Sequence, residues 1–216
     1  MQNISHIIFD WDGTVMDSTQ KIVNCMQIAA KNSALPVPSA ADVQHIIGIS
    51  LVPAISQLFD ITQDMAEKVS FHYKDAFLRH DKTACDLFCG AHDTLSALQQ
   101  KYTLGVATGK ARRGLVRAFE ATNTAKYFCT SRCADDDGVS SKPSPIMLQQ
   151  LLQYWQIDAS NAVMIGDTSY DMEMAKAIGM HRIGVSYGAH GVDTLQHYTP
   201  VTIINQLSEL RDIFNA

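Results

Sequence analysis

The chain divides into a helical stretch and a longer stretch in which helices and strands alternate. An apolar run near the amino terminus, Ile7-Ile8-Phe9, predicts a buried strand. From residue 17 to residue 79, apolar positions recur at helical spacing and do not alternate with period two. From residue 84 onward, short apolar runs separate amphipathic helical segments, which predicts strands and helices in turn.

The first stretch is expected to form a small helical bundle. Its expected helices span residues 17–32, 41–47, 51–58 and 63–79. Pro36 and Pro38 end the first helix, and Gly48 separates the second helix from the third.

The second stretch is expected to form a parallel sheet with helices on both faces. The expected helices span residues 91–101, 113–121, 145–155 and 170–178, and the expected strands span residues 103–107, 127–131, 162–165, 182–185 and 201–204. The strand at residues 7–9 has no partner within the helical stretch, so it joins this sheet. The predicted fold class is therefore α/β, with a Rossmann-like parallel sheet. Residues 1–15 and 84–216 would form a discontinuous core domain, and residues 16–83 an inserted helical domain.

Composition and charge narrow the possible partners. The chain has 216 residues, of which 46% are hydrophobic and 18% are charged, as in ordinary globular proteins. The net charge of −5 comes without a clustered basic segment, so we expect no nucleic-acid partner. No stretch approaches the roughly 20 apolar residues of a membrane span. The amino terminus lacks the features of a signal peptide, so we expect no membrane association and a cytoplasmic location.

The cysteines do not predict a metal site. Their odd number, five, favours reduced thiols. Cys85 and Cys89 are four residues apart, as are Cys129 and Cys133, and this is wider than the usual spacing of structural zinc ligands. We interpret the thiols as buried or incidental.

The strongest chemical signal is a pair of aspartates directly after the first strand. Asp10 and Asp12 are followed by Gly13 and Thr14, and Gly13 permits a sharp turn. Both carboxylates would lie at the carboxyl end of the strand, where open α/β sheets build their ligand sites. Crowded carboxylates repel each other unless a cation or a shared proton intervenes. The alternative is an acidic turn in which Asp12 or Thr14 only satisfies backbone donors.

Three further polar groups follow other expected strands or precede a helix. They are Thr108-Gly109-Lys110, Lys142-Pro143, and the segment from Gly166 that holds Asp167 and Asp171. Taken singly, Thr108 and Asp167 are explained as helix caps and Lys142 as a solvated surface lysine. Taken together, they bring four carboxylates, a hydroxyl and a lysine to one edge of the sheet. Oxygen ligands of this kind suit Mg²⁺, which also binds phosphate.

These four elements, in this order, resemble the signature of the haloacid dehalogenase superfamily of phosphohydrolases. The helical insertion is similar to the small cap of the phosphoglycolate phosphatase-like branch. The resemblance covers essentially the whole chain, and the set of four elements is far more specific than any one of them.

The resemblance implies a phosphatase mechanism through an aspartyl-phosphate intermediate. Asp10 would be the nucleophile, and Asp12 the general acid and then the general base. Thr108 and the Gly109 amide would hold a phosphoryl oxygen, and Lys142 would neutralise charge on Asp10 and on the phosphoryl group. The presence of Asp12 favours phosphoryl transfer over dehalogenation, because a halide leaves without a proton.

The resemblance also implies a magnesium cofactor. Asp10, the main-chain carbonyl of Asp12 and Asp167 would hold the ion, and Asp171 would support it directly or through water. The ion would offset the repulsion between an anionic nucleophile and an anionic ester.

The expected substrate is a small phosphorylated metabolite, with 2-phosphoglycolate as the first candidate. Two alternatives remain open: a phosphomutase of the β-phosphoglucomutase type, and a non-catalytic module that binds phosphorylated metabolites. The oligomeric state, monomer or homodimer, is also open.

The residues that select the leaving group are open as well. For the loop Gly48-Ile49-Ser50 and for Lys74 and Arg79, an exposed surface position is favoured over a substrate contact. For Lys110, Arg112 and Arg113, substrate contact and a solvated helix start explain the sequence equally well. Trp11 is expected to point away from the two acids that flank it and to pack in the core.

Overall fold

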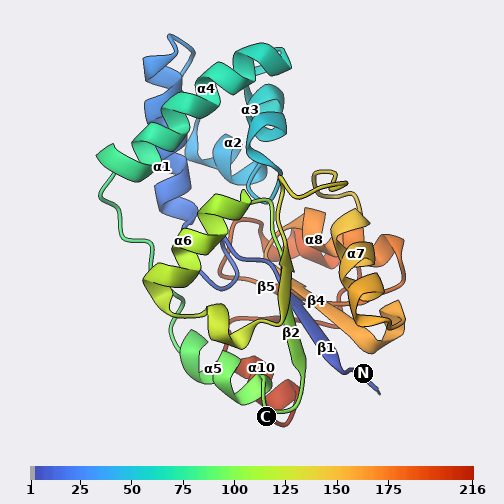
Figure 1. The fold of residues 1–216 in the computed structure, drawn as a ribbon. Helices are drawn as coiled ribbons and strands as arrows, with labels where there is room; N and C mark the ends of the chain where they lie inside the picture. Colours follow the sequence, from blue (N-terminus) through green and yellow to red (C-terminus); the bar gives the residue numbers. More distant parts are fainter. Residues whose placement is uncertain (1–2) are drawn as a thin grey trace.

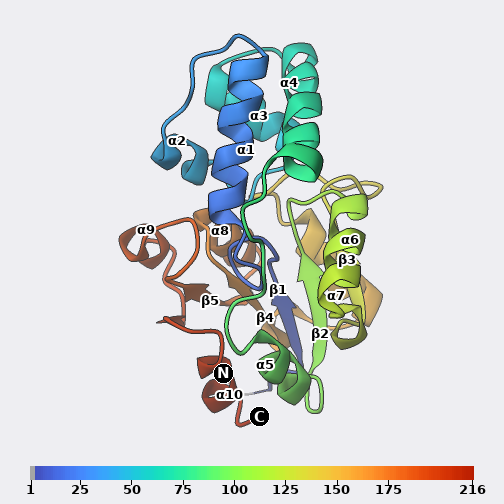
Figure 2. The ribbon, with the colours of Figure 1, turned by 90° about the vertical axis from the view of Figure 1, so that its left-hand side faces the viewer.

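The computed structural model describes residues 3–216, and its centre is a six-stranded parallel sheet with strand order β3-β2-β1-β4-β5-β6 (Figures 1 and 2). The strands are β1 (His6–Phe9), β2 (Thr103–Ala107), β3 (Thr130–Arg132), β4 (Ala162–Gly166), β5 (His181–Val185) and β6 (Thr202–Ile204). The predicted α/β class is confirmed. Residues 1 and 2 of the predicted core domain lie outside the described part of the chain.

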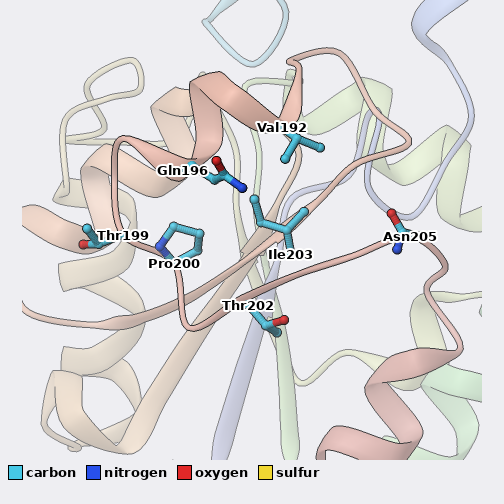
Figure 3. Close-up of a pocket in the computed structure, with 7 residues that line it drawn as sticks. All are labelled: Val192, Gln196, Thr199, Pro200, Thr202, Ile203 and Asn205. Atoms are coloured by element: carbon cyan, nitrogen blue, oxygen red, sulfur yellow. The ribbon is translucent and has the colours of Figure 1, made fainter.

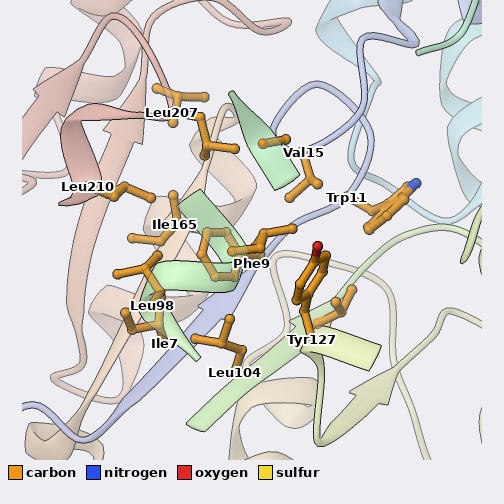
Figure 4. Close-up of a cluster of buried hydrophobic side chains, with 14 of the residues drawn as sticks. Ile7, Phe9, Trp11, Val15, Leu98, Leu104, Tyr127, Ile165, Leu207 and Leu210 are labelled. Atoms are coloured by element: carbon orange, nitrogen blue, oxygen red, sulfur yellow. The ribbon is translucent and has the colours of Figure 1, made fainter. Parts of the chain in front are cut away.

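The two faces of the sheet are covered because neighbouring residues of a strand point to opposite sides. Ile7 and Phe9 of β1 belong to a core cluster on one face, and Ile8 belongs to a cluster on the other. The first face packs against α5 (Ala91–Leu98), α6 (Arg112–Thr122) and α10 (Glu209–Ile213) (Figure 4). The second face packs against α7 (Ile146–Trp155) and α8 (Ser169–Ala177). Trp11 is fully buried in the core, as predicted, and its ring packs edge-on against Phe119.

The helical segment, residues 16–83, stands over the carboxyl ends of the strands (Figures 1 and 2). It contains α1 (Thr19–Asn32), α2 (Ala40–His45), α3 (Leu51–Phe59) and α4 (Gln63–Asp75), which continues into a π-helical turn (Ala76–His80). It has its own apolar cluster, in which Met26, Val43 and Ile55 are at most 1% exposed. The helical segment and the two faces of the sheet therefore each have an apolar cluster of their own.

One predicted strand is misplaced, and two helices were not predicted. Residues 127–131 were expected to be extended, but Ala125–Tyr127 form a 3-10 turn, and β3 covers Thr130–Arg132. The turn forms because Asn123 adopts a left-handed conformation that ends α6, and the Tyr127 amide then donates to the Thr124 carbonyl. Helices α9 (Val192–Gln196) and α10 have five residues each, too few to show a helical period.

The cysteines are free thiols, and no helix among residues 3–216 is long and apolar enough to cross a membrane. Cys25 and Cys133 are buried, and burial raises the pKa of each thiol to about 12. Cys89 and Cys129 are exposed. The interpretation of the thiols as buried or incidental agrees with these positions.

Candidate active site

Three buried carboxylates meet at the carboxyl ends of the central strands. Asp10 follows β1, Asp167 follows β4, and Asp171 lies in the first turn of α8. One carboxylate oxygen from each lies within 4.8 Å of the others, and the three residues are at most 1% exposed. The structure therefore brings together acids that the chain separates by more than 150 positions. It does so because β1 and β4 are parallel neighbours, with Phe9 opposite Ile165.

Asp167 is held in place by close backbone approach and by two hydrogen bonds. A Cβ atom on Gly13 would lie 2.1 Å from Asp167 Oδ2, and one on Gly188 would lie 2.2 Å from Asp167 Cβ, so both positions require glycine. Gly13 also has a φ of +79°, which side chains disfavour. Thr14 Oγ1 donates to Asp167 Oδ1 at 2.8 Å, and the Ala189 amide donates to Oδ2 at 2.8 Å.

Asp171 is fixed by the start of α8 and by a buried lysine. Thr168 and Asp171 form a capping box, in which the Thr168 hydroxyl accepts from the Asp171 amide and the Thr168 amide donates to Asp171 Oδ2. The Thr168 hydroxyl also donates to Oδ2. The other oxygen, Oδ1, accepts from Lys142 Nζ at 2.7 Å. The explanation of Asp167 as a helix cap is therefore wrong: the N-cap of α8 is Thr168, and Asp171 completes the cap and also belongs to the acidic cluster.

Lys142 is the cation of the cluster and does not lie at the surface. Its side chain is 0% exposed, and its ammonium lies 2.9 Å from Asp10 Oδ1 and 2.7 Å from Asp171 Oδ1. Burial alone would lower the pKa of Lys142, but the charges of Asp10 and Asp171 raise it above the ordinary value. The ammonium therefore stays charged, and the surface alternative for Lys142 is wrong.

The carboxylates are not fully compensated by this one lysine. Burial raises the pKa of Asp10 well above its ordinary value, Lys142 opposes the shift, and the charges of Asp171 and Asp167 add to it. Burial and then the charge of Asp171 raise the pKa of Asp167 to about 7, against the hydrogen bonds from Ala189 and Thr14. Lys142 and Asp10 Oδ1 form an ion pair, but their geometry is not that of a hydrogen bond. This buried oxygen therefore receives no hydrogen bond from residues 3–216. The donor set fits a hard divalent cation.

Asp12 lies apart from the three clustered carboxylates and has its own partners. Lys110 Nζ lies 2.9 Å from Asp12 Oδ1 and 2.7 Å from Oδ2. Ser18 Oγ donates to Asp12 Oδ1 at 2.7 Å. The Asp12 and Lys110 side chains are 14% and 15% exposed.

A cavity of about 870 Å³ lies between the carboxylates and the helical segment. Asp10, Asp12, Thr108 and Gly109 line it from the sheet side. The residues for which the sequence favoured an exposed surface position over a substrate contact all line it from the opposite side: Gly48, Ile49, Ser50, Lys74 and Arg79. The two sides touch, because a Cβ atom on Gly109 would lie 2.3 Å from the Gly48 carbonyl oxygen.

A second hollow, of about 540 Å³, lies at the edge of the sheet (Figure 3). Neutral side chains from α9, β6 and the residues beside them line it: Val192, Gln196, Thr199, Pro200, Thr202, Ile203 and Asn205. β6 is separated from β4 by β5, so this hollow is distinct from the cluster of acids. The carboxylates of Asp10 and Asp12 and the Thr108 hydroxyl line the first cavity, and Asp10 also contacts Lys142 and the other buried acids. The first cavity is therefore the candidate active site.

The sequence left Lys110 undecided and missed Ser18. Arg112, which was grouped with Lys110, instead pairs with Asp136 and donates to Ser131. The one local signal for Lys110 is its position two residues after Thr108, at the end of β2. Ser18 is the N-cap residue of α1, but its hydroxyl makes no capping bond to the helix and donates to Asp12 instead.

Comparison with known proteins identifies the family. Residues 7–185 match the haloacid dehalogenase-like hydrolase family. A probable phosphatase IndB of Dickeya dadantii is 31% identical over 209 residues, which cover 94% of this chain and 90% of that protein. A phosphoglycolate phosphatase of Vibrio parahaemolyticus is 27% identical, with 98% and 96% covered.

Solved structures show the same fold. A haloacid dehalogenase-like family protein of Streptococcus pneumoniae has a TM-score of 0.86 at 24% identity, with 99% of this chain and 100% of that chain covered. The family match over residues 7–185 and the relative that is 31% identical show that the chain is a hydrolase that belongs to the haloacid dehalogenase-like family.

Proposed function

We propose that the protein is a phosphatase of small phosphate monoesters that works through an aspartyl-phosphate intermediate. The observation that carries the proposal is the placement of Asp10. Its carboxylate lies beside Lys142 and the two other buried acids and also lines a cavity large enough for a metabolite. The names of the Dickeya and Vibrio relatives support the same activity.

The chain's own residues supply both halves of the reaction. An Asp10 oxygen bonds to phosphorus while the bond to the leaving oxygen breaks, and that oxygen takes a proton from Asp12. Asp12 then takes a proton from water, the water oxygen attacks the phosphorus, and phosphate departs as Asp10 is regenerated. Thr108 and the Gly109 amide hold a phosphoryl oxygen, and Lys142 balances charge on Asp10 and on the phosphoryl group.

We also propose that the acidic cluster holds Mg²⁺. Asp10, the main-chain carbonyl of Asp12, Asp167 and Asp171 would be its protein ligands. When bound, the ion supplies the positive charge that lets an anionic carboxylate approach an anionic ester. The proposal is supported by the surplus of buried carboxylates over Lys142 and by Asp10 Oδ1, a buried oxygen that receives no hydrogen bond from residues 3–216.

We propose further that residues 16–83 act as a cap domain over the core formed by residues 1–15 and 84–216. The loop at Gly48 reaches Gly109, and the Ser50 amide donates to Ser141 Oγ at 2.9 Å. Such closure excludes water from the reacting phosphoryl group. 2-Phosphoglycolate is the first candidate substrate, since a relative with nearly full coverage is named for it.

A screen of phosphorylated metabolites, with Mg²⁺ and with chelator, tests the proposed function. Phosphate release that needs the metal supports it. Glucose 6-phosphate formed from β-glucose 1-phosphate without phosphate release would assign a phosphomutase instead. Inactivity across the panel would favour a non-catalytic binding module.

Mg²⁺ should raise the melting temperature, and by more at pH 8 than at pH 5. The folded protein raises the pKa of Asp167 from 3.8 to about 7, so the metal-free protein loses stability as the pH rises through that interval. Asp10, shifted in the same direction, adds to the loss. A bound cation offsets this loss of stability, because it stabilises the charged carboxylates. Thermal melts at both pH values, with and without MgCl₂, measure the difference; equal shifts at both would contradict the assignment of these acids as ligands.

Asp12→Asn should separate the two chemical steps. With p-nitrophenyl phosphate the leaving group needs no proton, so the first step should survive and the second should slow by about 10²- to 10⁴-fold. Rapid mixing should show one burst of p-nitrophenol followed by slow turnover. With an alkyl phosphate both steps need Asp12, so no burst is expected. Unchanged steady-state turnover of the variant would remove Asp12 from the mechanism.

A further inference from the structure

Two side chains of the core contact the same carbonyl oxygen of the cap. This oxygen belongs to His45, the last residue of α2. Tyr170 Oη donates to it at 2.8 Å, and His190 Nε2 lies 3.2 Å from it. Tyr170 lies in the first turn of α8, and His190 lies between β5 and α9. The three rings also pack together, because the centroid of the His190 ring is 5.8 Å from that of His45 and 5.4 Å from that of Tyr170.

The His190 ring is held so that Nε2 is the donor to the cap. Its Nδ1 accepts from the Ser169 amide at 3.0 Å, and a ring nitrogen that accepts a hydrogen bond carries no proton. The proton is then on Nε2, which faces the His45 oxygen. The backbone amide of His190 donates to the Asp167 carbonyl at 3.3 Å, and the residue is 6% exposed. His190 is therefore fixed by the core and offers one donor to the cap.

His45 leads into the loop that covers the candidate active site. The loop, residues 46–50, links α2 to α3, and each of its residues lines the cavity. At its far end the Ser50 amide donates to Ser141 Oγ of the core at 2.9 Å. The loop is thus held to the core at both ends, and the His45 carbonyl is the contact at the α2 end.

The loop depends on such contacts for its position. Gly48, at its centre, has a φ of +99°, and a glycine gives a free segment more conformations than other residues do. The contacts with the core offset the conformational entropy that the loop loses when it docks. The net contribution of one hydrogen bond changes an equilibrium of this kind by about two- to tenfold.

We propose that Tyr170 and His190 are positioning residues, which dock the loop at residues 46–50 over the phosphoryl site through the His45 carbonyl. Neither side chain lines the cavity, so both act through the loop and not on the substrate. The docked loop completes the wall that holds the leaving group and excludes water. Inorganic phosphate has no leaving group, so its binding needs only the core. The inference rests on the proposed function, since it takes this cavity as the place of reaction.

Two substitutions remove the donors with little other change. Tyr170→Phe deletes only the hydroxyl group. His190→Asn keeps an acceptor for the Ser169 amide, because the asparagine oxygen takes about the place of Nδ1, but its side chain is too short to reach the His45 oxygen. Tyr154→Phe, at a tyrosine of α7 that is 58% exposed, is the matched control.

Amide hydrogen exchange followed by NMR in the metal-free protein measures the docking without any activity. The Ser50 amide, whose partner is in the core, should exchange about two- to tenfold faster in either variant and faster still in the double variant. The Ile55 amide, inside α3, should keep its wild-type rate, and Tyr154→Phe should change neither. An unchanged Ser50 rate in the double variant would overturn the inference. Equal acceleration at Ser50 and Ile55 would also overturn it, because the two side chains would then only stabilise the cap.

Steady-state kinetics with Mg²⁺ test the consequence for the reaction. In the double variant, kcat/KM for 2-phosphoglycolate and for p-nitrophenyl phosphate should fall by about tenfold or more, while the inhibition constant of inorganic phosphate stays within about twofold. An equal loss for the esters and for phosphate would contradict a role through the loop. No turnover of either ester by the wild type would refute the proposed function and the role in the reaction, whereas the exchange rates decide the docking itself.

Discussion

Asp10→Asn is expected to lower phosphate release by on the order of 10⁴-fold, the scale of losing a covalent nucleophile or its essential partner. The amide is nearly the same size as the carboxylate, but it cannot form the acyl phosphate. The variant should still fold, because the change removes one of three carboxylates that repel each other in a buried site. Steady-state phosphate release measures the loss, and a thermal melt in chelator measures the stability.

The melt also serves as the control for this variant. Without metal, Asp10→Asn should melt at or above the wild-type temperature, so that inactivity cannot be attributed to unfolding. If the variant retained wild-type turnover on phosphate esters, Asp10 would not be the nucleophile.

Lys142→Met is expected to destabilise the metal-free protein by about 3–5 kcal/mol, the cost of leaving buried charges without their partner. The methionine fills similar volume, so the effect isolates the ammonium. Lys142 is 0% exposed and approaches Asp10 and Asp171 to within 2.9 Å, and both carboxylates would then be buried without it. Urea denaturation in chelator gives the free energy of unfolding.

Exposed Lys68→Met is the matched control for Lys142→Met, since it removes the same charge from a solvated position. Its free energy of unfolding should stay within about 0.5 kcal/mol of the wild type. A Lys142→Met protein as stable as this control would show that the acids of the cluster are protonated in the metal-free protein and need no cation.

The sequence predicted the sheet and the convergence of its polar ends for a physical reason. Parallel strands end at one edge, so residues that follow buried apolar runs, such as Asp10, Thr108 and Asp167, must come near one another. The strand predicted at residues 127–131 is misplaced because its apolar run begins with Tyr127, which is buried in a 3-10 turn against α5. Burial alone does not distinguish a turn from a strand.

The partners of the acids could not be predicted, because they depend on tertiary placement. Lys110 and Asp12 are 98 positions apart, and nothing in either local sequence indicates that they meet. Lys142, taken singly, was explained as a surface lysine, and its zero exposure in the structure excludes that explanation. Lys74 and Arg79 are exposed, as expected, and yet line the cavity, because the end of α4 overhangs the core.

The mass of the peptide that contains Asp10, taken from enzyme quenched in acid during turnover with Mg²⁺, tests the proposed chemistry most directly. Slowing the second step with Asp12→Asn should make the intermediate accumulate. We expect the mass increment of one phosphoryl group on Asp10, present with Mg²⁺ and lost when chelator is added before the substrate. An unmodified Asp10 during metal-dependent turnover, or the same increment in chelator, would contradict a carboxylate nucleophile that depends on a bound cation.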